Sequence, residues 1–293
     1  MRAARYVGRF APTPSGDLHL GSLYTAAASY LDARANCGLW LLRIEDLDAP
    51  RAVPGASERI IATLQRFGFE WDGEIVRQRN RIEHYRAALQ TLRDRGLTFE
   101  CTCSRSQLED EQSYPGTCRA LARLPGADSA TRLRVDPDLV SFSDEIQGSF
   151  RQNVAAAVGD LIIKRRDQVF AYLLAVVVDD AAQGVNHVVR GADLLDNTPR
   201  QIYLQRRLGF DTPRYAHVPV LTEADDTKLA KSRRSVRADI AAPLAQLLSV
   251  FSLLGMRPPA ELQSAELADV WRWGIAAWNR NAVPSRLNLR LMT

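Results

Sequence analysis

The sequence has no long hydrophobic run, and this absence excludes a membrane-spanning protein. The longest uncharged apolar segment covers nine residues, 170–178, whereas a helix needs about 20 apolar residues to cross a bilayer. The N-terminus also lacks the apolar core of a signal peptide. We therefore expect a cytoplasmic protein without a membrane partner. With 293 residues, 46% of them hydrophobic, it can bury one large core or two smaller ones.

Lysine is rare in this chain, with three among 38 basic residues. Two of the three, Lys228 and Lys231, lie in one short segment. In an arginine-rich chain such lysines suggest a task for which arginine is unsuited, such as a mobile point charge on a phosphate. Basic residues exceed acidic ones in residues 190–293, by 15 to 10. This surplus is compatible with a nucleic-acid face and equally with an ordinary solvated surface.

Cysteine is also scarce, and three of the four cysteines lie close together. Cys101, Cys103 and Cys118 fall within eighteen residues. In a cytoplasmic chain this clustering indicates a metal site rather than disulfides. Three thiolates are one ligand short of a closed zinc site, and Tyr114 could supply a phenolate. The alternative is three reduced cysteines without metal. We expect the fourth cysteine, Cys37, to be buried and to have no part in this cluster.

The hydrophobic pattern predicts an α/β fold. A strand over 7–10, a helix over 20–35 and a buried strand over 39–44 would form a βαβ unit. The polar segment 98–125 contains proline and glycine and is typical of an insertion. Further helices are expected at 56–68, 79–95 and 172–182, strand-like segments at 131–170 and 186–189, and helices alone after residue 235.

Two short segments suggest ligand contacts. His19 and Gly21 stand at the start of the first helix, where free N–H groups and the helix dipole favour an anion. His19 could donate to a phosphate or ribose oxygen, or it could be an ordinary structural histidine. The acidic residues Glu45, Asp46 and Asp48 follow the second strand. They lie at the sheet edge where ligands bind, so they could hold a cationic amine, or they could form a surface acidic cluster.

Several segments together resemble the class I aminoacyl-tRNA synthetases. The HIGH signature appears as residues 19–22, His-Leu-Gly-Ser, and KMSKS appears as residues 228–232, Lys-Leu-Ala-Lys-Ser. The glutamyl subgroup is resembled more narrowly by residues 8–16, 43–46, 172–180 and 187–193. Ser22 replaces the last histidine of HIGH, and Ala230 replaces the middle serine of KMSKS. These replacements keep open an inactive, tRNA-binding relative.

The resemblance implies a Rossmann-like class I synthetase nucleotide-binding fold with a zinc-bearing insertion and a short helical C-terminal region. It implies four parts: a first catalytic half (1–97), an insertion with the zinc site (98–184), a second catalytic half (185–234) and a helical end (235–293). Because 61 residues follow Ser232, we expect no anticodon-binding domain. Histidines 84, 187 and 217 are expected to be structural.

Since we expect no anticodon-binding domain, this chain resembles the truncated paralogue of glutamyl-tRNA synthetase. That paralogue activates L-glutamate with ATP and Mg²⁺ and transfers it to queuosine in the anticodon of tRNA(Asp). We expect it to be a monomer. The alternatives are a glutamyl-tRNA synthetase working without an anticodon domain, a nucleotidyltransferase of small metabolites, and the inactive relative.

The resemblance also implies site residues. Glutamate would be held by Arg9, Ala11, Thr13, Ser15, Glu45, Tyr172 and Arg190. ATP would contact His19, Gly21, Ser22 and Lys231, with catalytic roles for His19, Gly21, Lys228 and Lys231, and Zn²⁺ would bind Cys101, Cys103, Tyr114 and Cys118. Glu45 suits the α-ammonium. A guanidinium fork distinguishes the side-chain carboxylate from an amide, so we assign that carboxylate to Arg190, with Arg9 as the rival.

Overall fold

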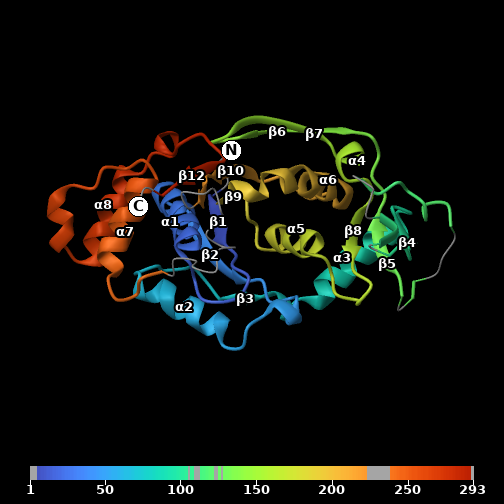
Figure 1. Ribbon diagram of the computed structural model, residues 1–293, viewed down its shortest axis with the longest axis horizontal. Helices are drawn as coiled ribbons and strands as arrows, with labels where there is room; N and C mark the ends of the chain where they lie inside the picture. The colour runs from blue at the N-terminus through green and yellow to red at the C-terminus, as the bar shows by residue number, and fades with distance from the viewer. Residues whose placement is uncertain are drawn as a thin grey trace.

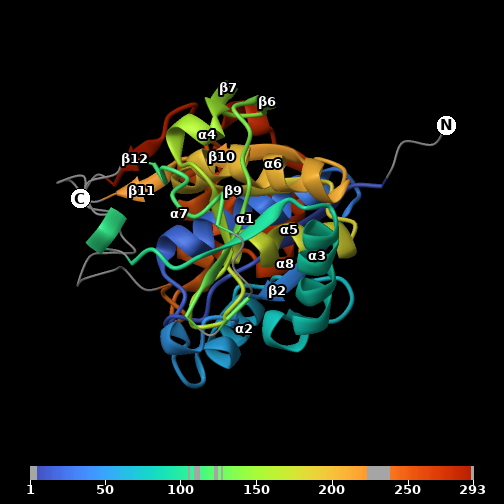
Figure 2. The same ribbon diagram turned by 90° about the vertical axis from the view of Figure 1, so that its right-hand side faces the viewer.

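The computed structural model describes residues 5–104, 106–108, 113–121, 125–126, 128–222 and 238–291. Figure 1 shows an elongated molecule with the C-terminal helices α7 and α8 at one end and the small sheet of β4 and β5 at the other. Figure 2, turned by 90°, shows the β6–β7 hairpin and helix α2 at opposite edges. No helix in these ranges is long and apolar enough to cross a membrane.

The centre of the molecule is a parallel sheet in two halves. One half has the strand order β1-β2-β3, and the other has the order β7-β6-β10-β9, with β7 antiparallel to β6. The N–H of Asn186 donates to the carbonyl of Val7 over 3.1 Å, which brings the start of β9 beside β1. The strands are β1 (Val7–Phe10), β2 (Leu39–Ile44), β3 (Val76–Arg77), β6 (Leu139–Asp144), β7 (Gly148–Asn153), β9 (His187–Gly191) and β10 (Arg214–Val218).

Helices cover both faces of this sheet, and their buried faces form two apolar clusters. Helix α1 lies centrally, with eleven of its sixteen residues buried, and four of these are alanines, which let the helix pack close to the strands. The helices are α1 (Leu20–Ala35), α2 (Ala56–Arg66), α3 (Ile82–Asp94), α4 (Val154–Ala157), α5 (Tyr172–Ala182), α6 (Thr198–Leu208), α7 (Pro243–Leu253) and α8 (Leu267–Ala277).

A buried carboxylate on α1 fixes the C-terminal helices. Asp32, 1% exposed, accepts two hydrogen bonds from the Arg280 guanidinium, at 3.0 and 2.7 Å, and one from Trp278 Nε1 at 2.9 Å. Tyr6 donates a further hydrogen bond over 2.5 Å. Because an unpaired carboxylate in this position would be strongly destabilising, these donors tie the end of the chain to its first helix.

A second, antiparallel sheet has the order β4-β5-β8 and is covered by a small separate cluster. Its strands are β4 (Thr98–Cys101), β5 (Ala130–Leu133) and β8 (Leu161–Lys164). Cys101 ends β4, so this sheet places one of the clustered cysteines.

The predicted elements of the first βαβ unit and the helix at 172–182 are confirmed with the same bounds, and the α/β class is confirmed. The expectation of helices alone after residue 235 is wrong, because β12 (Asn288–Arg290) pairs in parallel with β11 (Val220–Thr222). Cys37 is exposed rather than buried. It lies in the turn after α1, where its φ is 51°.

Candidate active site

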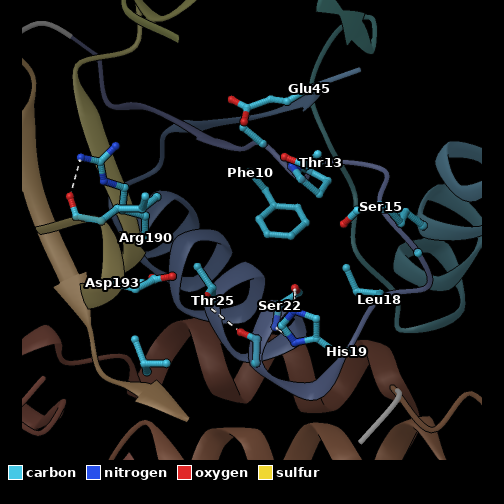
Figure 3. A pocket seen from close by; sticks show the side chains of 18 of the residues that line it. Phe10, Thr13, Ser15, Leu18, His19, Ser22, Thr25, Glu45, Arg190 and Asp193 are labelled. Atoms are coloured by element: carbon cyan, nitrogen blue, oxygen red, sulfur yellow. Dashed lines mark hydrogen bonds between the residues drawn. The ribbon is translucent and has the colours of Figure 1, made fainter. Parts of the chain in front are cut away.

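A cavity of about 550 Å³ opens at the carboxyl ends of β1 and β9, where the two halves of the central sheet meet. Ligands of open α/β sheets bind at such a switch point because the loops diverge there. Figure 3 shows Arg190 and Asp193 on one wall, Ser15 and Leu18 on the opposite wall, and Glu45 and His19 at two further sides. We call this space the main cavity.

Ten of the sequence-predicted site residues line the main cavity. They are Arg9, Ala11, Thr13, Ser15, His19, Gly21, Ser22, Glu45, Tyr172 and Arg190. Asp193, from the turn after β9, lines it as well. The predicted Lys228 and Lys231 lie outside the described residues.

His19 is the N-cap of α1. Its Nδ1 accepts a hydrogen bond from the Ser22 N–H over 3.2 Å, and its Nε2 lies 2.9 Å from Ser22 Oγ. Burial lowers the pKa of His19, against a smaller opposing effect of Asp193. The ring is therefore neutral at pH 7. The serine in the last HIGH position thus holds the histidine of the first position.

Glu45 sits in a buried lattice of alternating charges. Asp180 bridges Arg9, at 3.2 Å, and Arg43, at 2.7 Å, and Arg43 lies 3.6 Å from Glu45. Burial raises the pKa of Glu45 to about 7, although Arg43 and Arg9 oppose this shift. Within the described residues, Glu45 Oε1 is buried and has no hydrogen-bond partner. It lies 3.6 Å from Arg43 Nη2, and the carboxylate lines the main cavity, where its charge could attract a cationic ligand.

Asp179 anchors the other side of this lattice. It is fully buried and accepts hydrogen bonds from Gln78 Nε2 at 2.9 Å, Arg81 Nε at 2.5 Å and the Tyr85 hydroxyl at 2.8 Å. Neither Asp179 nor Asp180 faces solvent, and the two adjacent residues hold α5 against β1, β2 and α3. The lattice keeps Arg9 engaged by Asp180, so Arg9 is the less available of the two candidate arginines.

Arg190 is 4% exposed and is held by neutral partners. Its Nε donates to His217 Nε2 over 3.0 Å, and its Nη2 donates to Thr198 Oγ1 over 2.8 Å. Nη1 is buried without a hydrogen-bond partner among the described residues. In the same ranges no carboxylate forms an ion pair with Arg190. A buried guanidinium without a counter-ion is costly unless a ligand supplies one.

The partners of Arg190 were missed by the sequence reasoning. His217 is fully buried and lies between Arg190 and Asp144, whose Oδ2 is 2.5 Å from His217 Nδ1. The expectation of a merely structural histidine is incomplete, because this one contacts a cavity residue. No local motif marks the group, since Asp144, Arg190 and His217 come from three different strands. Only the pairing of β10 with both β9 and β6 joins them.

Four donor atoms converge at the small sheet, and we call them the cysteine cluster. The Sγ atoms of Cys101, Cys103 and Cys118 lie within 4.8 Å of one another, with 3.6 Å between Cys103 and Cys118. Tyr114 Oη lies 3.4 Å from Cys101 Sγ. Thiolates that share a zinc ion at about 2.3 Å lie about 3.8 Å apart, so the spacing fits a tetrahedral metal.

The surroundings of the cluster favour the thiolate form of Cys118. Burial raises the pKa of Cys118, but hydrogen bonds to the Thr102 backbone, Tyr114 and the other cysteines outweigh it and bring the pKa to about 7. Burial raises the pKa of Cys103 to about 11 and also raises that of Tyr114. Gly159, at φ of 73°, admits the backbone of Tyr114, because a Cβ there would lie 2.3 Å from the Tyr114 carbonyl oxygen. This cluster could bind a metal.

Comparison with known proteins defines the class. The family model for the catalytic domain of class I tRNA synthetases (E and Q) matches residues 6–270. The glutamate-tRNA synthetase of Elizabethkingia anophelis has the same fold, with a TM-score of 0.82 at 23% identity over 99% of this chain and 68% of that one. A glutamate tRNA ligase from Elizabethkingia meningosepticum, solved in complex with its amino acid, gives 0.80 at 23% identity over 98% and 67%.

Sequence relatives narrow the class. A protein of Ectopseudomonas mendocina is 55% identical over 95% of this chain and 95% of its own length, and one of Pseudomonas aeruginosa is 52% identical over the same shares. Both are named Glutamyl-Q tRNA(Asp) synthetase. The chain therefore belongs to the class I tRNA synthetases of the E and Q type, in the family of these Glutamyl-Q tRNA(Asp) synthetases.

Proposed function

We propose that this enzyme activates L-glutamate with ATP to glutamyl-adenylate and transfers the glutamate to the queuosine base in the anticodon of tRNA(Asp). The names of its close relatives support this substrate pair. ATP would enter as its Mg²⁺ complex. We further propose that the chain acts as a monomer, with an insertion near 98–184 between the two catalytic halves.

The observation that carries the amino-acid assignment is a pair of unsatisfied groups on one cavity. Arg190 Nη1 and Glu45 Oε1 are buried, opposite in charge and without a hydrogen-bond partner in the described part of the chain. Glutamate offers a carboxylate to the first and an α-ammonium to the second. The Arg190 charge would then gain a counter-ion, and Glu45 would gain a second cation beside Arg43, which favours binding by this amino acid over one with a neutral side chain.

Activation is attack of the α-carboxylate of glutamate on the α-phosphate of ATP, which releases pyrophosphate. The reaction needs positioning and charge stabilisation more than a protein base. His19 and Gly21 would place the nucleotide at the N-terminus of α1, where backbone N–H groups attract phosphate. Ser22 would keep the ring of His19 in place. Lys231, assisted by Lys228, would neutralise the pyrophosphate.

We also propose that the cysteine cluster holds one structural Zn²⁺. Cys101, Cys103 and Cys118 would bind as thiolates and Tyr114 as the fourth ligand. The ion would lower the pKa of Tyr114, which burial otherwise raises. The metal would stabilise the end of β4 and the strand-poor segment around it.

The test is incubation with labelled glutamate, ATP and Mg²⁺, together with tRNA(Asp) or tRNA(Glu), each with and without queuosine. We expect label on queuosine-containing tRNA(Asp) alone. Labelled tRNA(Glu) would instead establish a glutamyl-tRNA synthetase. Absence of any glutamyl-adenylate would leave an inactive tRNA-binding relative and overturn the proposal.

A further inference from the structure

The inference concerns a chain of three buried side chains behind Arg190, and it rests on the proposed function. Arg190 lies near the carboxyl end of β9, and His217 is paired with it on the neighbouring strand β10. Asp144 is the last residue of β6. The three side chains are 4%, 0% and 3% exposed. The contacts run in one line from Asp144 Oδ2 to His217 Nδ1, and from His217 Nε2 to Arg190 Nε, at 2.5 and 3.0 Å.

The hydrogen bonds determine where the imidazole carries its proton. Arg190 Nε can only donate, so His217 Nε2 must accept. The ring proton is then on Nδ1, where it is donated to Asp144. Burial, the largest influence, lowers the pKa of His217, and Arg190 acts in the same direction while Asp144 opposes it. The neutral Nδ1–H tautomer is the form that satisfies both neighbours.

Asp144 is itself oriented by the backbone. Its Oδ1 accepts hydrogen bonds from the N–H groups of Ile146 at 3.0 Å, Gln147 at 2.8 Å and His217 at 3.1 Å. Three donors therefore occupy one oxygen and leave Oδ2 for the imidazole. Burial raises the pKa of Asp144, but the hydrogen bond with the His217 side chain and those from the backbone N–H groups of Gln147 and His217 outweigh it and keep the pKa low.

We infer that Asp144 and His217 are positioning residues for glutamate specificity: Asp144 fixes the tautomer of His217, and His217 aims the Arg190 guanidinium at the side-chain carboxylate of the substrate. The hairpin of β6 and β7 thereby contributes to amino-acid selection without touching the substrate. The carboxylate of Asp144 also balances the Arg190 charge from the far side of the ring, so the near side stays open for glutamate.

The decisive variant is Asp144→Asn. Three backbone N–H groups require an oxygen at the Oδ1 position, so the new amide nitrogen must face His217 Nδ1. The ring then moves its proton to Nε2, and two donors confront each other between His217 and Arg190. We expect the KM for glutamate in ATP–pyrophosphate exchange to rise about 10- to 100-fold, with the KM for ATP unchanged. The preference for glutamate over glutamine should fall by a similar factor.

Two substitutions of His217 separate orientation from packing. In His217→Gln the amide oxygen reaches the Nε2 position and still accepts from Arg190, so activity should stay within about threefold of the wild type. In His217→Asn the amide reaches only the Nδ1 position, and the variant should resemble Asp144→Asn. Adding Asp144→Asn to His217→Gln should cost little more, because no imidazole remains to change its tautomer. The matched control is Asp138→Asn, which changes an exposed carboxylate immediately before β6.

An unchanged glutamate KM in Asp144→Asn, or a rise shared equally with ATP, would overturn the inference. So would a His217→Gln variant as impaired as His217→Asn. If the wild type shows no glutamate-dependent ATP–pyrophosphate exchange, the proposed function fails. The ¹⁵N NMR spectrum of the four histidines then still tests the chain of hydrogen bonds from Asp144 through His217 to Arg190. Nδ1–H in the wild type and Nε2–H in Asp144→Asn would support it, whereas Nε2–H in the wild type would refute it.

Discussion

The main cavity brings together side chains from distant parts of the chain, whereas the cysteine cluster comes from residues 101–118, and the two sites stabilise their side chains differently. In the main cavity, buried charges compensate one another through Asp180 and Arg43, and two atoms, Glu45 Oε1 and Arg190 Nη1, have no hydrogen-bond partner among the described residues. In the cysteine cluster, the donor atoms contact one another, with Cys103 beside Cys118 and Cys101 beside Tyr114.

This difference indicates which site can exist without its ligand. The lattice of the main cavity is built into the central parallel sheet and α5, so its geometry is maintained by the core. The cysteine cluster belongs to a three-stranded sheet with a small apolar cluster of its own. Small units of this kind usually depend on a metal for stability. We therefore expect changes in the cavity to affect catalysis and changes in the cluster to affect stability.

The largest effect is expected for Arg190→Gln. If Arg190 binds the substrate carboxylate as proposed, loss of its guanidinium should lower kcat/KM for glutamate about 10³-fold or more. The melting temperature should not fall, because the variant removes a buried charge that has no carboxylate partner in the described chain. Pyrophosphate exchange and thermal unfolding measure the two quantities. Arg206→Gln, at an exposed position on α6, is the control. Activity within tenfold of the wild type would transfer the role to Arg9.

The next effect is expected for Cys118→Ser. Bound zinc should fall from about one equivalent per chain to nearly none, and stability should drop by about 2–4 kcal/mol. Glutamate-dependent exchange at low temperature should change only a few-fold. Elemental analysis and thermal melting provide the measurements, with the exposed Cys37→Ser as control. A wild-type protein that contains no metal and melts unchanged with a chelator would rule out a structural zinc.

The smallest effect is a pH dependence of the main cavity. Glu45 must be ionised to hold an ammonium, and burial raises its pKa to about 7. Between pH 8 and pH 6, kcat/KM for glutamate should therefore fall about tenfold. A wild-type profile that is flat over this range would contradict the role of Glu45.

The same shift has a consequence for stability. Because the folded-state pKa lies above the usual value of 4.5, the contribution of Glu45 is fully present below pH 4.5 and is lost as the pH rises through 7. Glu45→Gln should accordingly be at least as stable as the wild type at pH 8 while failing to bind glutamate. Urea unfolding of the wild type and of Glu45→Gln at pH 5 and pH 8 measures this difference in the free energy of unfolding.

The parts of the fold that follow from periodicity could be predicted from the sequence. Helical spacing of apolar residues predicts α1 and α5 with their bounds, and a nearly continuous apolar run predicts β2. The loop and helix start around His19 follow from proline, glycine and the HIGH resemblance. The strand β12 could not be predicted, because three residues carry no period and depend on β11 as partner.

The candidate site likewise contains residues that the sequence pattern reveals and residues that only the fold brings together. Residues within recognisable segments, such as Glu45 and Arg190, could be predicted to lie at the site, and both line the main cavity. Asp144 and His217 could not, since their role arises from the order of strands rather than from neighbouring residues. The exposure of Cys37 could not be predicted either, because its place in the turn after α1 depends on where the helix ends and how the turn packs.

The attachment of Arg280 to Asp32 bears on how the protein is made. The two residues are 248 positions apart, and a ribosome adds roughly 5–20 residues per second, so about 12–50 s separate their synthesis. During that interval Tyr6 can already donate to Asp32, but the guanidinium that neutralises the carboxylate does not yet exist. The first helix of the chain therefore gains its full set of contacts only after the last part of the chain has been synthesised.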